Sequence, residues 1–303
     1  MNILITGGLG FIGNHLVRHL INASPENKIV VIDNLSSGSV SFLKDIRSKF
    51  TFYNIDIINK GELDKCFKKE RPDIIIHLAA IHFIPECNQN PPKTISVNII
   101  GTHNVVDLAN KYNVKQFIFA SSASVYGATR KKNNEDDVPN PVDIYGCSKL
   151  CGEQITKTLC QVNWSILRFF NVIGTNETHE HLLPVIIKQL KNDRGLVLGN
   201  LESTRDYLFV GDLVNGVSRV INNKKAYSQV LNLGTGRGTS VRNVVRGFEV
   251  ALKKRIEIEQ SANLKRSIDN PVLVASIEKI QKLINWQPEY HFQEALNEIL
   301  FAK

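Results

Sequence analysis

The sequence predicts an α/β protein built on a doubly wound parallel sheet, with a smaller α/β lobe in its C-terminal half. Three observations support this fold class. Short apolar runs alternate with helical patterns through the first half of the chain, as expected of a parallel sheet covered by helices. A glycine-rich turn follows the first apolar run, and the regular alternation loosens after Asn171.

The expected strands of the first half are short runs rich in branched apolar residues and bounded by polar or turn residues. They span residues 2–6, 28–33, 50–54, 74–77, 116–120 and 165–168. Helices are expected over residues 11–22, 60–69, 94–111 and 144–160. Because parallel strands need crossover connections, these helices should cover the faces of one sheet.

The second half is less regular. We expect helices over residues 181–191, 210–221 and 241–252, a short strand over 195–199, and a strand followed by a flexible loop over 231–238. Segment 128–142 is rich in charged residues, Asn and Pro. This composition predicts a mobile surface loop ahead of the helix 144–160.

Composition sets limits on the class of protein. The chain has 303 residues, 43% hydrophobic and 22% charged, which suffices for a substantial core. The net charge of +8 is scattered and no nucleic-acid motif accompanies it, so we expect no nucleic-acid partner. We also expect no metal and no membrane span. The five cysteines contain no Cys-x-x-Cys and no leader-like segment opens the sequence, which favours reduced thiols in the cytoplasm.

A glycine-rich turn joins the first predicted strand to the first predicted helix. It carries Gly7, Gly10 and Gly13, with Phe11 and Ile12 at the start of the helix. Such glycines permit a tight turn, close approach of a pyrophosphate and close packing of helix on strand. The helix N-terminus supplies free N–H groups for phosphate. A turn of this kind can be purely structural, so its neighbours decide the interpretation.

Asp33 ends the second predicted strand, roughly twenty residues after Gly13. A carboxylate there accepts hydrogen bonds from the adenosine ribose hydroxyls and repels a 2′-phosphate. With Asn34 beside it, Asp33 therefore predicts NAD in preference to NADP.

Two further segments end strands on the same side of the sheet. Asp56 and Ile57 follow the third strand and either flank the adenine or close an ordinary loop. Leu78, Ala79 and Ala80 end the fourth, where small residues suit either a passing cofactor or plain packing.

Tyr145 and Lys149 are four residues apart in the helix 144–160 and therefore share one face. Such a pair is often just an exposed helical pair, but this one follows the glycine turn and Ser122 at the end of the fifth strand. A free phenol, with a pKa near ~10, is a poor base at neutral pH, and a nearby ammonium stabilises its phenolate. The pattern predicts a redox site in which Tyr145 takes a hydroxyl proton.

These motifs carry a resemblance to a known family. They lie at residues 7–13, 33, 77–80, 98–102, 121–127 and 145–149. The chain resembles an extended short-chain dehydrogenase/reductase of the NAD-dependent nucleotide-sugar epimerase/dehydratase family over essentially its full length. The resemblance implies a Rossmann-like NAD-binding domain in residues 1–172 and a nucleotide-sugar-binding lobe in 173–303. Residues of about 205–235 should fold back onto the first domain.

The resemblance also implies a homodimer formed through the predicted helices 94–111 and 144–160. The apolar stripes of these helices are equally typical of a core. Within the site, it implies that Lys149 holds the nicotinamide ribose and that Asn98 supports this lysine. Ser122, Ser124 and Tyr145 should face the sugar.

Several later residues match substrate positions of the family. The resemblance implies that Asn171 and Arg205 contact a diphosphate and that His181 and Leu182 begin a helix facing the nucleobase. Arg266 and Asp269 form a late Arg-x-x-Asp element that offers a second guanidinium, a group whose fork matches phosphate oxygens. Leu273 stands where UDP-glucose epimerases resemble one another in having Tyr, and a Leu leaves room for an N-acetyl group.

The residues after Ser122 bear on the reaction. Family dehydratases place acidic residues there, whereas this chain has Ala123 and Ser124. This favours a 4-epimerase that acts on a UDP-hexose or UDP-N-acetylhexosamine through a 4-keto intermediate. Two alternatives remain: a nucleotide-sugar dehydratase whose acid lies elsewhere, such as Glu86, and a non-catalytic NAD-binding regulator. A regulator has no need of Ser122, Tyr145 and Lys149 together.

Two segments depart from the family pattern. His82 follows the fourth strand, where it either reaches the sugar or packs within its loop. Segment 174–181 is shorter than the matching loop of many UDP-glucose epimerases, so we expect a different pocket rim.

Overall fold

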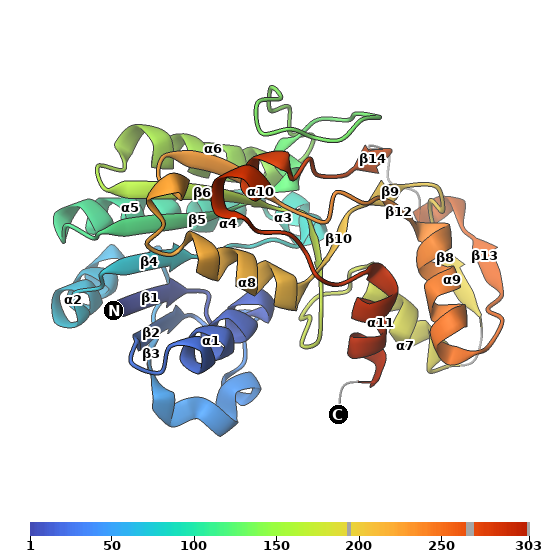
Figure 1. Cartoon of the computed structure of the whole chain (residues 1–303), viewed down its shortest axis with the longest axis horizontal. Coiled ribbons are helices and arrows are strands. Elements are labelled where there is room, and N and C mark those ends of the chain that lie inside the picture. The colour runs from blue at the N-terminus through green and yellow to red at the C-terminus, as the bar shows by residue number, and fades with distance from the viewer. Residues whose placement is uncertain (193–194, 265–269, 302–303) are drawn as a thin grey trace.

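Seven parallel strands form the central sheet (Figure 1). In the computed structural model, which describes residues 1–192, 195–264 and 270–301, their order is β11-β6-β5-β4-β1-β2-β3. The strands are β1 (Asn2–Thr6), β2 (Lys28–Asp33), β3 (Phe50–Asn54), β4 (Ile74–His77), β5 (Gln116–Ser122), β6 (Asn163–Phe169) and β11 (Gln229–Leu233). The order changes direction between β1 and β4, where the carboxyl ends of the strands open a crevice. The predicted fold class is confirmed.

Helices cover both faces of this sheet. One face packs against α1 (Phe11–Ala23), α8 (Val210–Val220) and the 3-10 segment η1 (Val40–Lys49), and the other against α2 (Lys60–Glu70), α5 (Thr102–Lys111) and α6 (Ile144–Leu159). Successive strand residues point to opposite faces: Ile3 and Ile5 lie in one core and Leu4 in the other. Burial on both faces explains the nearly continuous apolar strands of the sequence.

A second core lies beyond the carboxyl ends of the strands, on the right in Figure 1. It is built from α7 (Leu182–Leu190), α9 (Val241–Leu252), α11 (Phe292–Phe301), β8 (Leu196–Leu198) and β13 (Ile258–Gln260). The same chain half also supplies β11 to the main sheet and α8 to its outer face. Residues 205–235 thus include elements that belong to the central sheet or pack on it.

Short strands connect the two cores. They are β7 (Asn171–Ile173) with β10 (Tyr207–Phe209), and β9 (Thr204–Arg205) between β12 (Thr239–Ser240) and β14 (Val272–Leu273). Asp206 links them: its buried carboxylate accepts hydrogen bonds from Thr235 N, Thr235 Oγ1, Gly236 N and Ala275 N, at 2.6 to 3.1 Å. This one side chain fixes the position of Arg205 relative to the end of β11.

The remaining elements are short. They are α3 (Ile84–Gln89), α4 (Pro91–Ile95), the π-helix η2 (Ser96–Gly101), η3 (Ala123–Val125), η4 (Lys224–Ala226), η5 (Ala262–Leu264) and α10 (Glu278–Ile284). The helix predicted over 94–111 is therefore three segments, α4, η2 and α5. Single turns of π-helix are frequent at functional sites, and the sequence pattern of a π-turn is too close to that of an α-helix to be told apart.

The predicted surface loop over 128–142 is only partly on the surface. Asn133 and Glu135 are buried. The backbone of Asn133 bonds with Val274 and Ser276, and the Glu135 carboxylate accepts a bond from Asn232 N at 2.8 Å. The prediction of a mobile exposed loop was wrong for these residues because their polar groups find partners inside the fold.

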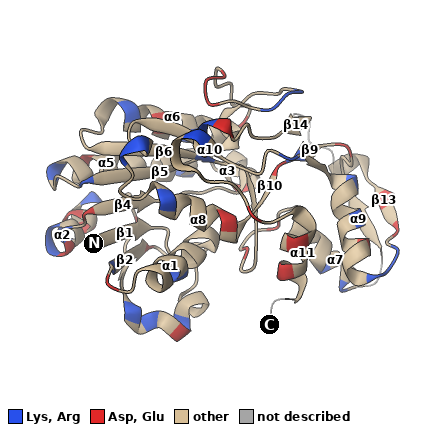
Figure 2. Cartoon of the chain, viewed as in Figure 1, with Lys and Arg blue, Asp and Glu red and all other residues tan. Residues whose placement is uncertain are grey.

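Charged residues of both signs are dispersed over the outer helices (Figure 2). In this view the Lys and Arg residues gather over no single element, as the scattered pattern of the sequence predicts. Among the described residues, no helix combines the length and apolar character needed to cross a bilayer.

A buried ion pair fastens α6 to the sheet. Arg168 of β6 donates from Nε and Nη2 to the two carboxylate oxygens of Glu153, both at 2.8 Å. Ser121 Oγ of β5 donates to the same carboxylate at 2.6 Å. All three side chains are almost completely buried, so the helix cannot slide or rotate without leaving a charge without a partner in the core.

We predict that Glu153→Ala lowers the free energy of unfolding by about 3–5 kcal/mol, because it leaves the Arg168 guanidinium buried and unpaired. Urea denaturation followed by circular dichroism measures this. The matched control is Asp107→Ala, which removes a half-exposed pair with Lys60 and should cost below about 1 kcal/mol. Equal losses in the two variants would contradict the structural role of the buried pair.

Candidate active site

A cavity of about 840 Å³ opens at the carboxyl ends of the strands, between the sheet and the second core. Most residues that the sequence analysis selected line it. They are Gly7, Gly10, Phe11, Ile12, Gly13, Asp33, Asn34, Asp56, Ile57, Leu78, Ala79, Ala80, Ser122, Ser124, Tyr145, Lys149, Asn171, His181, Leu182, Arg205 and Leu273. Residues far apart in sequence thus meet at one site, because parallel strands end at one edge of a sheet.

The glycine turn forms one end of the cavity. Gly7 has a φ of 70°, and a Cβ there would lie 2.8 Å from Ala79 N. At Gly10 a Cβ would meet only Gly7 O, at 3.4 Å, so the backbone lies open beside the first turn of α1. Free N–H groups at this helix start can reach a phosphate directly. The turn fits the pyrophosphate of a dinucleotide.

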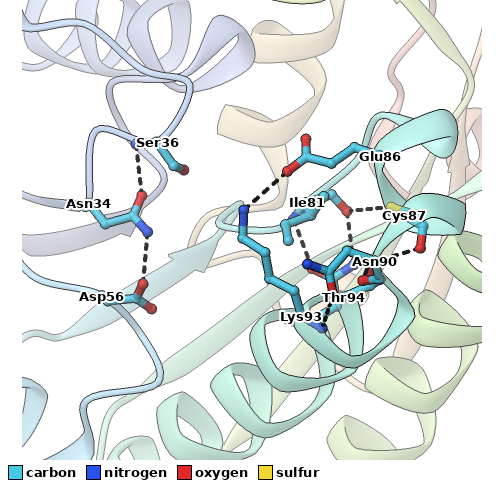
Figure 3. A network of polar contacts seen from close by, with 10 residues as sticks. Asn34, Ser36, Asp56, Ile81, Glu86, Cys87, Asn90, Lys93 and Thr94 are labelled. Carbon is cyan, nitrogen blue, oxygen red and sulfur yellow. Dashed lines mark hydrogen bonds and ion pairs between the residues drawn. The ribbon is translucent and has the colours of Figure 1, made fainter.

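Asp33 lies next to this turn and is held by it. Its carboxylate accepts bonds from Leu9 N at 3.0 Å and Leu35 N at 2.8 Å. Burial raises the pKa of Asp33, while these two bonds lower it. Asn34 Nδ2 donates to Asp56 Oδ2 at 2.9 Å (Figure 3), which joins the loops after β2 and β3. The arrangement suits an adenosine whose ribose hydroxyls donate to Asp33.

Asn98 does not reach the cavity wall. From the π-helix η2, its side chain accepts a bond from Ile81 N at 2.8 Å and donates to Ile81 O and Ser148 Oγ, both at 2.9 Å. It therefore joins the loop after β4 to the residue that precedes Lys149. This contact supports α6 and the cavity wall; it is not a direct bond to Lys149.

Ser122, Tyr145 and Lys149 converge on the middle of the cavity. Asp143 caps α6 by accepting a bond from Gly146 N at 2.7 Å, which sets where the helix begins and so which residues face β5. Lys149 Nζ donates to Ala120 O at 2.8 Å and lies 5.9 Å from the centre of the Tyr145 ring. Ser122, at the end of β5, lies close enough to Tyr145 for its side chain to influence the pKa of the phenol.

Burial shifts the pKa values of both Tyr145 and Lys149. It raises the pKa of Tyr145 well above 10, an effect that the Ser122 side chain partly offsets. It lowers the pKa of Lys149 to about 8, because an ammonium is poorly solvated there. Because burial disfavours the phenolate form of Tyr145, this side chain can act as a base only if a nearby positive charge stabilises the phenolate. Perturbed titratable groups in a cavity are typical of catalytic centres.

The second core supplies the other end of the cavity. Arg205 of β9 lines the wall, and its Nη1 donates to Asn270 O at 2.7 Å. Leu273 of β14 pairs with Arg205 across the strands and is 8% exposed. Asn171, His181 and Leu182 complete this end. Arg266 and Asp269 lie outside the described residues.

The sequence analysis missed several wall residues. Phe83, Lys93, Glu177 and His179 line the cavity, as do two residues that it discussed without selecting, His82 and Glu86. Figure 3 shows Lys93 of α4 reaching toward Glu86 of α3, and the pair is 3.2 Å apart. The available signal was position: Phe83, Glu86 and Lys93 follow β4, and Glu177 and His179 lie between β7 and α7.

Comparisons with known proteins agree with this geometry. Residues 3–234 match the model of the NAD dependent epimerase/dehydratase family. The chain is 32% identical to a bifunctional UDP-glucose 4-epimerase and UDP-xylose 4-epimerase of Arabidopsis thaliana, over 97% of this chain and 92% of that protein.

Two solved structures are similar over nearly the whole chain. A UDP-glucose 4-epimerase from Thermotoga maritima, crystallised with UDP-glucose, has a TM-score of 0.90 and 28% identity, covering 99% of this chain and 97% of that one. A dTDP-glucose 4,6-dehydratase from Bacillus anthracis, in complex with NAD, has a TM-score of 0.90 and 25% identity, covering 99% and 95%.

The chain belongs to the NAD-dependent epimerase/dehydratase family. It is an enzyme, and its cofactor is NAD. The resemblance found in the motifs of the sequence is thereby confirmed.

We predict that the protein binds NAD at least about tenfold more tightly than NADP, because the Asp33 carboxylate repels a 2′-phosphate. Fluorescence titration of cofactor-free protein measures both affinities. Asp33→Ser should narrow the difference while Asp56→Ser leaves it intact. Equal affinities in the unaltered protein would contradict the role of Asp33.

Proposed function

We propose that this protein is a nucleotide-sugar 4-epimerase that acts on a UDP-hexose or UDP-N-acetylhexosamine through a 4-keto intermediate. The observation that carries the proposal is the convergence of Ser122, Tyr145 and Lys149 on the cavity wall, next to a turn and an aspartate that fit NAD. NAD supplies the chemistry of accepting a hydride from C4 of the sugar and returning it.

Each side chain of the chain has a separate task in this proposal. Tyr145 takes the proton of the C4 hydroxyl as the carbon is oxidised, and gives it back when the ketone is reduced. Ser122 donates a hydrogen bond to the same oxygen and steadies the developing carbonyl. Lys149, whose Nζ is already held by Ala120 O, stabilises the phenolate and orients the nicotinamide ribose.

Epimerisation requires the keto-sugar to rotate within the cavity, so that the ketone is reduced on its other face. It requires no additional acid at C5 or C6. The two positions after Ser122 are Ala123 and Ser124, and the short helix η3 directs the Ser124 N–H back to Ser122 Oγ at 3.1 Å. The absence of a carboxylate at these positions supports the epimerase.

A dehydratase is the second candidate, because Glu86 of α3 lines the same cavity, where it is paired with Lys93 at 3.2 Å. A dehydratase needs an acid that gives a proton to a leaving hydroxyl, and Glu86 is the residue that we assign to this role in the alternative. The reaction product distinguishes the two candidates.

The residues at the end of the cavity formed by the second core are suited to bind a nucleoside diphosphate. We propose that Arg205 and Asn171 bind the diphosphate, and that His181 and Leu182 at the start of α7 face the base. A guanidinium matches phosphate oxygens in shape and charge. We also propose that the Arg-x-x-Asp element of Arg266 and Asp269 offers a second guanidinium, that of Arg266, to the diphosphate.

Proton and carbon NMR of the purified protein with UDP-glucose, UDP-N-acetylglucosamine or UDP-glucuronate tests the proposal. The C4 epimer of a neutral or N-acetylated sugar is the expected product. A deoxy or unsaturated product would establish the dehydratase instead. No conversion of any of the three, with NAD supplied, would contradict the epimerase and favour a non-catalytic NAD-binding protein.

We predict that Leu273→Tyr selectively lowers activity on N-acetylated sugars. Leu273 is buried beside Arg205, so a larger side chain there must occupy cavity space, and overpacking a filled site costs about 1–3 kcal/mol. The ratio of kcat/KM for UDP-N-acetylglucosamine to that for UDP-glucose should fall about tenfold. An unchanged ratio would remove Leu273 from sugar selection.

We predict that Tyr145→Phe retains bound NAD and loses at least about a hundredfold in kcat, the contribution typical of a positioned general base. The ring still packs, but no group takes the C4 proton. Steady-state NMR assays and the cofactor content of the purified variant measure the two quantities. Near-normal turnover would exclude Tyr145 as the base.

We further propose a cytoplasmic homodimer formed through α4, η2, α5 and α6. Ile95, Ile100 and Leu159 are exposed on these elements, at 42 to 50%, and exposed apolar residues grouped on adjacent helices are typical of an interface. Light scattering of the full chain should give twice the monomer mass; a monomer at micromolar concentration would contradict this assembly.

A further inference from the structure

Four rings from distant parts of the chain form one wall of the cavity. Phe83 and His179 are stacked with centroids 5.2 Å apart and an interplanar angle of 15°. His82 meets His179 edge-on at 4.6 Å, and His181 lies 5.8 Å from His82 and 5.5 Å from Phe83. All four line the cavity. We call His82, Phe83, His179 and His181 the ring wall.

The ring wall joins the two cores. His82 and Phe83 follow β4 of the central sheet, and His179 and His181 precede α7 of the second core. It also unites the two departures from the family pattern: the unusual histidine after β4 and the short segment 174–181. Within the wall, the rings of segment 174–181 contact those of the loop after β4.

Burial lowers the pKa of two imidazoles of the ring wall. Burial lowers the pKa of His82 to about 3 and lowers that of His179, and the facing imidazoles and Lys149 add to the effect on His82. Glu86 faces His179, and Glu177 Oε1 bonds His181 Nδ1 at 2.6 Å. His82 and His179 pack against Phe83 and against each other without charge repulsion when neutral, and this contact joins the two cores.

We propose that the ring wall retains the 4-keto intermediate in the cavity while it turns, an inference that rests on the proposed epimerase function. A keto-sugar in the middle of rotation has given up the contacts of its bound pose, and its nucleotide alone holds it. The stacked rings close the side of the cavity between the β4 loop and α7.

Retention matters because the reaction must balance within one active site. Oxidation breaks the C4–H bond, moves its hydride to NAD and passes the hydroxyl proton to Tyr145. The reverse transfer to the other face restores both. If the ketone leaves first, a free 4-keto nucleotide sugar is released and the cofactor stays reduced, so that each escape stops one enzyme molecule.

The test compares Phe83→Ala with the unaltered protein, each with NAD bound and the sugar nucleotide that it converts. Released ketone is trapped in the filtrate with borodeuteride, which places deuterium at C4, and is quantified by mass spectrometry. Near-ultraviolet absorbance reports reduced nicotinamide left on the protein. Because a ring pair contributes up to about 1.5 kcal/mol, we expect up to about tenfold more ketone per turnover and a progressive loss of rate.

Two variants control for stability and for imidazole chemistry. Phe292 does not line the cavity, and its ring lies 5.5 Å from that of Tyr207. Phe292→Ala should therefore remove a ring contact and release no extra ketone. His179→Phe keeps two stacked rings and should behave as the unaltered protein. Normal turnover with no extra ketone from Phe83→Ala would overturn the inference and leave the proposed function intact. Equal ketone release from Phe292→Ala would do the same. Absence of turnover in the unaltered protein overturns the proposed function and the inference with it.

Discussion

The buried pair of Glu153 and Arg168 is the interaction on which the site depends most. Tyr145, Lys149 and Glu153 follow one another at intervals of four along α6 and therefore share a face. The last of them is clamped to β6 by Arg168 and to β5 by Ser121 Oγ. Ser121 immediately precedes Ser122, so the clamp sets the distance between the hydroxyl of β5 and the phenol of α6. A shift of the helix by even one ångström would separate the two groups that the proposed reaction brings to the substrate oxygen.

Other parts of the molecule form the cofactor and substrate ends of the cavity around Ser122, Tyr145 and Lys149. The glycine turn and Asp33 lie at the point where the strand order changes direction, as dinucleotide sites do in such sheets. Arg205 and Leu273 come from short strands that Asp206 ties to the end of β11. In the proposed reaction, different cores therefore hold the cofactor and the nucleotide of the sugar. The ring wall joins these cores at one side of the shared cavity. This arrangement leaves the centre of the cavity free for a sugar to turn.

Much of the fold followed from the sequence because its signals are local. Apolar runs bounded by polar residues fixed the first four strands at residues 2–6, 28–33, 50–54 and 74–77, and the structure has the same bounds. The glycine turn and Asp33 predicted NAD, which is confirmed. What failed depends on long-range contacts. The π-turn at 96–101 differs from an α-helix by one hydrogen-bond step, and the burial of Asn133 and Glu135 depends on partners at Val274 and Asn232. The ring wall likewise arises only when segments about a hundred residues apart meet.

The most direct test of the account follows the hydrogen at C4. A nucleotide sugar that the protein converts is prepared with deuterium at C4 and incubated with the NAD-loaded enzyme in ordinary water, and the product is examined by NMR and mass spectrometry. Oxidation and return by Tyr145 and NAD in one cavity predict that the deuterium remains at C4 of the epimer. Deuterium found at C6 would mean elimination, and deuterium lost to solvent would mean that no hydride is held on the cofactor; either result would contradict the proposed reaction.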